Sequence, residues 1–170
     1  MAGQPRGWWI FFLILTALGG LVVWEGAGLP SQVASHFGPG GAPDGYSSRA
    51  VYRSLMLALV WLGPLLMAGG SALVLGRPGI PIHIPRGDYW LAAPRRSATL
   101  AYLTAHMQAA ALFLAGFLAY ANHLVVTAQG RQPVALDNAS LFLGVGLFFG
   151  ALLVLFGTLN RHFRRVPGDA

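Results

Sequence analysis

The chain has 170 residues, of which 55% are hydrophobic and 9% are charged, and its formal net charge is +6. Soluble globular domains carry about a quarter charged residues, so this composition excludes an ordinary soluble domain and predicts a membrane protein. All the basic residues are arginines that lie between apolar runs, with no basic patch interleaved with aromatic residues, so the charge indicates membrane topology and argues against nucleic-acid binding. Cysteine is absent, which excludes disulfides, thiolate metal sites and cysteine nucleophiles.

Four long apolar runs predict transmembrane helices, because about 20 apolar residues cross the hydrocarbon core and lipid-exposed backbone must satisfy its own hydrogen bonds. The first run is longer than the hydrophobic region of a signal peptide, so we expect it to remain as a membrane helix. The fold class is therefore all-α, an integral membrane four-helix bundle, and residues 1–170 form a single polytopic domain. The expected helices cover residues 7–26, 50–76, 97–127 and 138–160.

The arginines predict the orientation of these helices. Positive residues are enriched in cytoplasmic loops, and eight arginines lie on the side of the two termini against three on the other side. We therefore expect a protein of the inner membrane with both termini in the cytoplasm. The loop of residues 29–49 then faces outward, and the three arginines on its side are Arg49, Arg53 and Arg131.

The outward loop, LPSQVASHFGPGGAPDGYSSR, is dense in glycine and proline, which favour tight turns. One interpretation is a compact, ordered cap in which Asp44 bonds its own backbone. The other is a ligand-binding site in which the turns bring His36 and Asp44 together, with Tyr46 and Arg49 beside them. Both interpretations predict a structured extracytoplasmic loop.

Two further residues, Glu25 and His123, are expected at the same end of the helices. Imidazole nitrogens and carboxylate oxygens are ligands for zinc or copper, so Glu25, His36, Asp44 and His123 are candidate metal ligands. No diagnostic ligand spacing is present. The alternative is that His123 is a polar group at the headgroup level and that Glu25 pairs with Arg49 or Arg53.

Arg49 and Arg53 are four residues apart and so share one helix face. They could hold a lipid phosphate or a ligand carboxylate. The favoured interpretation is that they pair with Asp44 or Glu25.

Helices 3 and 4 contain further polar and small residues. His106 within the third apolar run could belong to a proton or ligand pathway, but interhelical hydrogen bonding is favoured because no carboxylate accompanies it. Gly146 and Gly150, one turn apart, predict close helix packing. Asp137 or Asn138 is expected to cap the fourth helix.

The second loop, PIHIPRGDYWLAAPRR, suggests an interfacial anchor built on Asp88 and Trp90. Arg95 and Arg96 then lie within reach of inner-leaflet phosphates.

The outward loop resembles the signature of the bacterial domain of unknown function DUF1648, with an LP start, a His-Phe pair, a glycine gap, an Asp-Gly-aromatic segment and a Ser-Arg pair. The second loop is similar to a segment of longer family members, although Ala93 departs from the usual pattern. The resemblance implies an SdpI-like membrane protein, of the type that confers immunity to a secreted toxin and takes part in signalling. The motif residues are Leu29, Pro30, His36, Phe37, Gly41, Asp44, Gly45, Tyr46, Ser48 and Arg49.

Three functions follow from these features, and no catalytic motif is found among them. The first is sensing, immunity or ligand binding through residues 29–49, with a peptide, lipid or membrane protein as partner. The second is a metal-binding protein or metal-dependent membrane enzyme that uses the His and carboxylate set. The third is a small transporter or subunit, in which a homo-oligomer encloses a path near His106.

Overall fold

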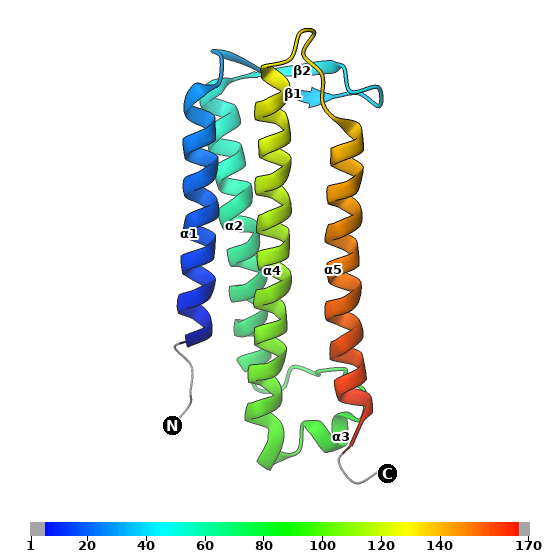
Figure 1. Ribbon diagram of the computed structural model, residues 1–170. Coiled ribbons are helices and arrows are strands. Elements are labelled where there is room, and N and C mark those ends of the chain that lie inside the picture. Colours follow the sequence, from blue (N-terminus) through cyan, green and yellow to red (C-terminus); the bar gives the residue numbers. More distant parts are fainter. Residues whose placement is uncertain (1–5, 167–170) are drawn as a thin grey trace.

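The computed structural model describes residues 6–166 and consists of long helices with a small β-hairpin at one end (Figure 1). Four of the helices are long and apolar enough to cross a membrane, and a 3-10 turn, Gly26–Gly28, follows the first of them. The elements in chain order are α1 (Arg6–Glu25), β1 (Gln32–Phe37), β2 (Pro43–Ser48), α2 (Arg49–Gly76), α3 (Gly87–Trp90), α4 (Ala93–Gln129) and α5 (Asn138–Arg164).

The four long helices confirm the predicted spans, and each begins or ends within a few residues of its predicted limits. The largest difference is in α4, which has 37 residues, six of them beyond the predicted limits of 97 and 127. At about 1.5 Å per residue this helix is longer than the roughly 30 Å hydrocarbon core. It therefore reaches beyond the apolar layer, as the length of its apolar run predicts.

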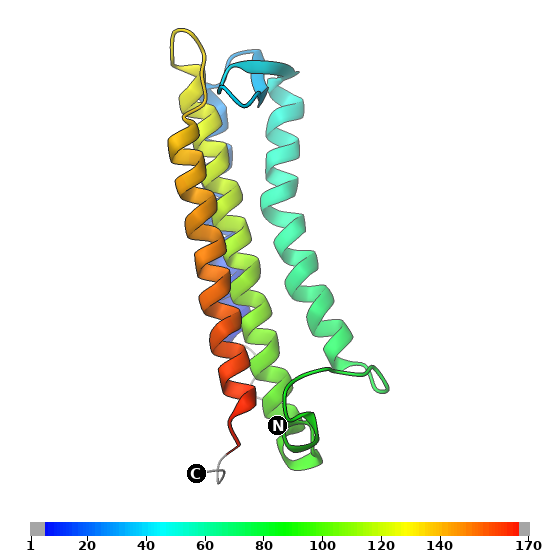
Figure 2. The ribbon, with the colours of Figure 1, turned by 90° about the vertical axis from the view of Figure 1, so that its right-hand side faces the viewer.

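Helix α4 is the centre of the molecule. It packs against α1, α2 and α5, and α1 also packs against α2. Figure 2 shows α5 running alongside α4, while α2 leans away from both towards the end where α3 lies. The four-helix bundle that we expected is therefore only partly found, because α5 is attached mainly through α4.

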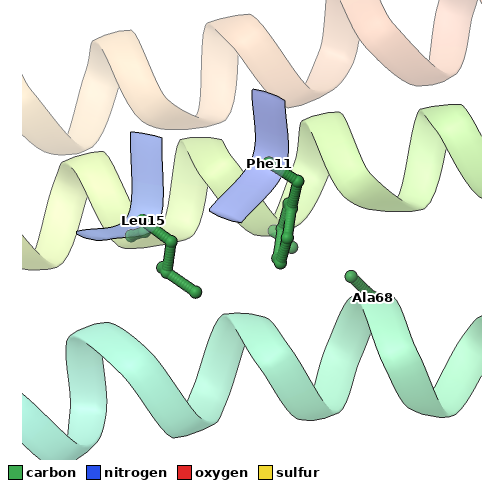
Figure 3. Close-up of a cluster of buried hydrophobic side chains, with 5 residues drawn as sticks. Phe11, Leu15 and Ala68 are labelled. Carbon is green, nitrogen blue, oxygen red and sulfur yellow. The ribbon is translucent and has the colours of Figure 1, made fainter. Parts of the chain in front are cut away.

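The core between α1, α2 and α4 is built from large side chains on α1 and small ones on α4. Phe11 and Leu15 are almost fully buried against Ala68 of α2, as Figure 3 shows. On α4, alanines recur every four residues on the facing side, at Ala111, Ala115 and Ala119. Small residues at this spacing let helix backbones approach closely, which is how membrane helices gain packing energy without a hydrophobic driving force.

Helix α5 packs on α4 through a glycine that differs from those we predicted. The ring of Tyr120 lies against Gly144 so closely that a Cβ there would overlap it, and the Tyr120 hydroxyl donates to the Ser140 carbonyl at 2.8 Å. By contrast, Gly146 and Gly150 have no neighbouring atoms where a side chain would begin. The expectation that these two glycines mediate helix packing is therefore wrong.

Residues 32–48 form an antiparallel hairpin, so the fold is mostly helical but not all-α. Strands β1 and β2 pair from Gln32 with Ser48 to Phe37 with Pro43, with a register shift around His36. Val33 of β1 is fully buried and packs against Leu29 and Tyr52. We call the end of the molecule that carries this hairpin the hairpin end, and the end that carries α3 the α3 end.

Candidate functional site

The hairpin brings His36 and Asp44 into direct contact at its surface. His36 Nδ1 lies 2.5 Å from Asp44 Oδ1, and the two side chains are 76% and 52% exposed. The close cross-strand approach depends on Gly45, which faces His36 and has no room for a side chain beside it. The predicted contact of His36 with Asp44 is therefore found, while the binding of a ligand there stays a prediction.

The hairpin is tied to α4 through the side chain of Gln129. Its Oε1 accepts from the Ala34 N–H at 3.0 Å, and its Nε2 donates to the Ala34 carbonyl at 3.1 Å. The amide group thus behaves like one more residue of a neighbouring strand and pairs with the outer edge of β1. This contact satisfies backbone groups that a two-stranded sheet would leave open.

The tip of the hairpin is held by the loop between α4 and α5. The Leu136 N–H donates to the Gly41 carbonyl at 2.9 Å, and Asn138 Nδ2 donates to the Pro39 carbonyl at 2.7 Å. Gly41 has a φ of +79°, and a Cβ there would overlap the Leu136 carbonyl, so only glycine suits both the turn and the contact.

The base of the hairpin is closed by Arg49. Its guanidinium donates to the Leu29 carbonyl at 2.9 Å, and its backbone N–H donates to the Ser31 carbonyl at 3.0 Å. Arg53 packs beside Gly26 and forms no ion pair with the residues that the structure describes. The expected pairing of these two arginines with Asp44 or Glu25 is therefore wrong.

The outer edge of β2 has no backbone partner among residues 6–166. The N–H and carbonyl of Ala34 both bond to Gln129, so they point away from β2, and Ala34 is paired with Tyr46. Residues opposite each other in an antiparallel ladder direct their backbone groups alike, either towards each other or away. The backbone groups of Tyr46 therefore point outward from β2, next to its exposed ring.

A second polar cluster joins α1, α2 and α4 just beneath the hairpin. Asn122 Nδ2 donates to Glu25 Oε2 at 2.8 Å, and the Tyr52 hydroxyl donates to Asn122 Oδ1 at 3.1 Å. His123 Nδ1 lies 2.6 Å from Glu25 Oε1, and the Glu25 side chain is 8% exposed. A buried carboxylate with this many donors is fully paired, so the cluster stabilises the contact of three helices.

The four candidate metal ligands thus form two pairs, His36 with Asp44 and Glu25 with His123. Among residues 6–166 no group of three or more His, Asp or Glu side chains lies close enough to hold a metal ion. Each pair satisfies itself by a hydrogen bond, and two protein ligands fall short of the three or four that transition-metal sites supply.

The polar residues at the α3 end bond within the protein. His106 Nδ1 bonds to the Tyr102 carbonyl of its own helix at 2.9 Å, so the predicted interhelical hydrogen bond is replaced by an intrahelical one. Trp90 Nε1 donates to the Phe163 carbonyl at 3.0 Å and so ties α3 to the last turn of α5.

Sequence reasoning missed the residues that hold the site together. No sequence pattern assigns a role to Gln129, Tyr52 or Asn122. Their bonds join residues 70 to 97 positions apart, which no local pattern encodes.

Comparison with known proteins agrees with the signature in the hairpin. No curated protein and no solved structure matches the chain. Residues 11–67, about a third of the chain, match the model of a domain of unknown function, DUF1648, which supports the resemblance over that segment. The matched segment contains Glu25 and the whole hairpin but not His123.

Proposed function

We propose that this multi-pass membrane protein is a receptor of the SdpI-like type, serving in sensing or immunity, that binds an extracytoplasmic ligand on its hairpin. The main support for ligand binding is that the hairpin is fixed at its base, edge and tip while the side chains of His36, Asp44 and Tyr46 are exposed. A rigid platform loses little conformational entropy on binding, so exposed polar and aromatic groups on it suit recognition.

The ligand is an extended peptide segment. The free edge of β2 offers backbone donors and acceptors at Tyr46, and peptides commonly add a strand to such an edge. The Tyr46 ring and the His36–Asp44 pair lie on the same hairpin and supply side-chain contacts that distinguish one peptide from another.

The proposed orientation places the hairpin outside the inner membrane, with both termini in the cytoplasm. The support is the arginine distribution, since eight of the eleven arginines lie at the α3 end or in the two terminal segments. A secreted peptide then reaches the hairpin without crossing the bilayer.

The test uses cells that depend on this protein for protection against a secreted peptide toxin. His36→Ala with Asp44→Ala should abolish protection and peptide binding, because the exposed pair is lost while the anchors of the hairpin remain. The matched control is His83→Ala with Asp88→Ala, an exposed His and Asp at the α3 end. Protection and binding that persist in the hairpin double variant would refute the assignment.

Metal binding has less support, because the candidate ligands are divided into two hydrogen-bonded pairs. Elemental analysis of chelator-free protein, with and without added zinc or copper, should give far less than one metal per chain. Stoichiometric metal that is lost in both His36→Ala and His123→Ala would instead support a site that draws on both pairs.

A further inference from the structure

Two hollows lie along the same face of α5, and together they have the shape and chemistry of a phospholipid site. The first, which we call the basic cavity, is an open cavity of about 450 Å³ at the α3 end, lined by Trp90, Thr158, Arg161, His162, Arg165 and Val166. The second, which we call the apolar groove, is a hollow of about 420 Å³ between α4 and α5. The residues of the groove used below are Phe113, Gly116, Phe117, Leu147, Phe148 and Ala151.

The basic cavity has the charge of an anion site. It contains two arginines and a histidine and no carboxylate among its lining residues. Arg161 and Arg165 form no ion pair with the residues that the structure describes, so their guanidinium groups are available to a ligand. Arginine binds phosphate oxygens through paired N–H groups.

The wall of the basic cavity is fixed by aromatic packing. The His162 ring stacks on Tyr102 of α4 at 4.3 Å between ring centres and lies 4.7 Å from Trp90 of α3. Trp90 is in turn bonded to the Phe163 carbonyl. Contacts with α3 and α4 thus hold His162 of α5 in place.

The apolar groove lies farther along α5 towards the hairpin end, on the helix face that carries Thr158 of the basic cavity. Leu147, Ala151 and Thr158 are spaced by four and seven residues and so share one face of the helix. From Arg161 to Leu147 the helix rises about 20 Å, which is about half of the 40–45 Å thickness of a bilayer with its headgroups. The acyl chain of a lipid whose phosphate lies at Arg161 therefore reaches the groove near the midplane. Free phosphate would use only the cavity, whereas a phospholipid uses both hollows.

We propose that the basic cavity and the apolar groove together bind one anionic phospholipid, with its phosphate between Arg161 and Arg165 and an acyl chain along the groove. The lipid lies along α5 from the α3 end, fills the groove between α4 and α5 with its acyl chain, and strengthens the attachment of α5. This site lies at the opposite end from the hairpin and does not rest on the proposed function.

The test is native mass spectrometry of the full chain in detergent with added phosphatidylglycerol, phosphatidylcholine or inorganic phosphate. Arg161→Gln should weaken phosphatidylglycerol binding about fivefold, and Arg161→Gln with Arg165→Gln by roughly the square of that factor. Arg77→Gln, an exposed arginine at the same end that lines neither hollow, is the matched control and should bind like the unaltered protein.

A second variant separates the lipid from free phosphate. Gly116→Leu fills the apolar groove, where glycine leaves open space, without changing any charge. It should weaken phosphatidylglycerol binding several-fold and leave binding of inorganic phosphate unchanged. Gly20→Leu, at an open lipid-facing position of α1, is its control and should have no effect.

Three results would overturn the proposal. Phosphatidylglycerol that binds equally well to the double arginine variant would remove the basic cavity from the site. If Gly116→Leu had no effect and inorganic phosphate fully displaced the lipid, the site would recognise phosphate alone and the apolar groove would not hold an acyl chain. Equal retention of phosphatidylcholine and phosphatidylglycerol would show that the arginines do not select an anionic headgroup.

Discussion

At the scale of single residues, Asn122 connects three helices through one amide. It donates to Glu25 of α1, accepts from Tyr52 of α2 and is itself 1% exposed on α4. A buried polar group that loses its hydrogen-bond partner destabilises the folded state, because its desolvation is no longer offset by a hydrogen bond. The hairpin end is therefore stabilised by a residue that never reaches the surface.

Asn122→Ala should lower the free energy of unfolding by about 1–3 kcal/mol, because it leaves a Glu25 oxygen and the Tyr52 hydroxyl unpaired. Thermal unfolding in detergent measures this change. Asn160→Ala, which removes an exposed amide bonded only to Arg164, is the control and should change stability little. Equal stability of the two variants would mean that the buried cluster contributes nothing.

Gly144 is the second residue on which the packing depends. Gly144→Ala should destabilise the contact of α4 with α5 by about 1–3 kcal/mol, since the new methyl group meets the Tyr120 ring. Gly146→Ala adds the same methyl group to open space and should be neutral or slightly stabilising. The same unfolding assay compares them, and a larger loss for Gly146→Ala would contradict the packing described for α5.

At the scale of elements, the hairpin depends on α4 for the protection of its β1 edge, because Gln129 pairs with the backbone of Ala34. Gln129→Ala removes two hydrogen bonds to Ala34, each contributing about 0.5–1.5 kcal/mol. Hydrogen exchange in β1 should therefore speed up at least several-fold while exchange in the middle of α4 stays unchanged. Unaltered exchange at Ala34 would show that the hairpin is held by its other anchors alone.

Helix α5 begins at a charged cap that confirms one of the two predicted residues. Asp137 accepts from the Ser140 N–H at 3.1 Å, and Arg131 lies 3.3 Å away. The Ser140 backbone bond, followed by Arg131, holds the pKa of Asp137 below its ordinary value of 3.8.

Because this pKa is lowered in the folded state, ionised Asp137 stabilises the fold above the ordinary carboxyl pKa, and the contribution is lost as pH falls through the lower, folded value. Asp137→Asn keeps a capping side chain but removes the titration. The protein should therefore be more stable than this variant at neutral pH, and the difference should vanish in strong acid. A difference that stays constant in unfolding curves across this range would contradict the linkage.

At the scale of the whole molecule, much of the architecture could be predicted from the sequence. Long runs without charge identify the four spans, because lipid forces the backbone into helices. The strands were missed because glycine and proline dominate residues 38–45, and these residues signal turns without showing the pairing on either side. The open packing of α5 was also missed, since an apolar helix looks alike whether it faces protein or lipid.

The candidate site was predictable where its contacts are local. His36 and Asp44 are eight residues apart, with a turn between them, and they do meet. The metal hypothesis depended on contacts between distant segments. In the structure Glu25 is hydrogen-bonded to Asn122 and His123, whereas His36 is hydrogen-bonded to Asp44. Residues that fix the hairpin from α4 and the following loop carry no signal that reveals their distant partners.

The orientation of the molecule decides whether the hairpin can meet a secreted ligand. The chain lacks cysteine, so single cysteines introduced at exposed Ala42 in the hairpin and exposed Ala93 at the α3 end report on one face each. The most direct measurement is labelling of intact cells with a membrane-impermeant maleimide. The account predicts that Ala42→Cys is labelled at once and Ala93→Cys only after the cells are permeabilised, whereas the reverse pattern would contradict it.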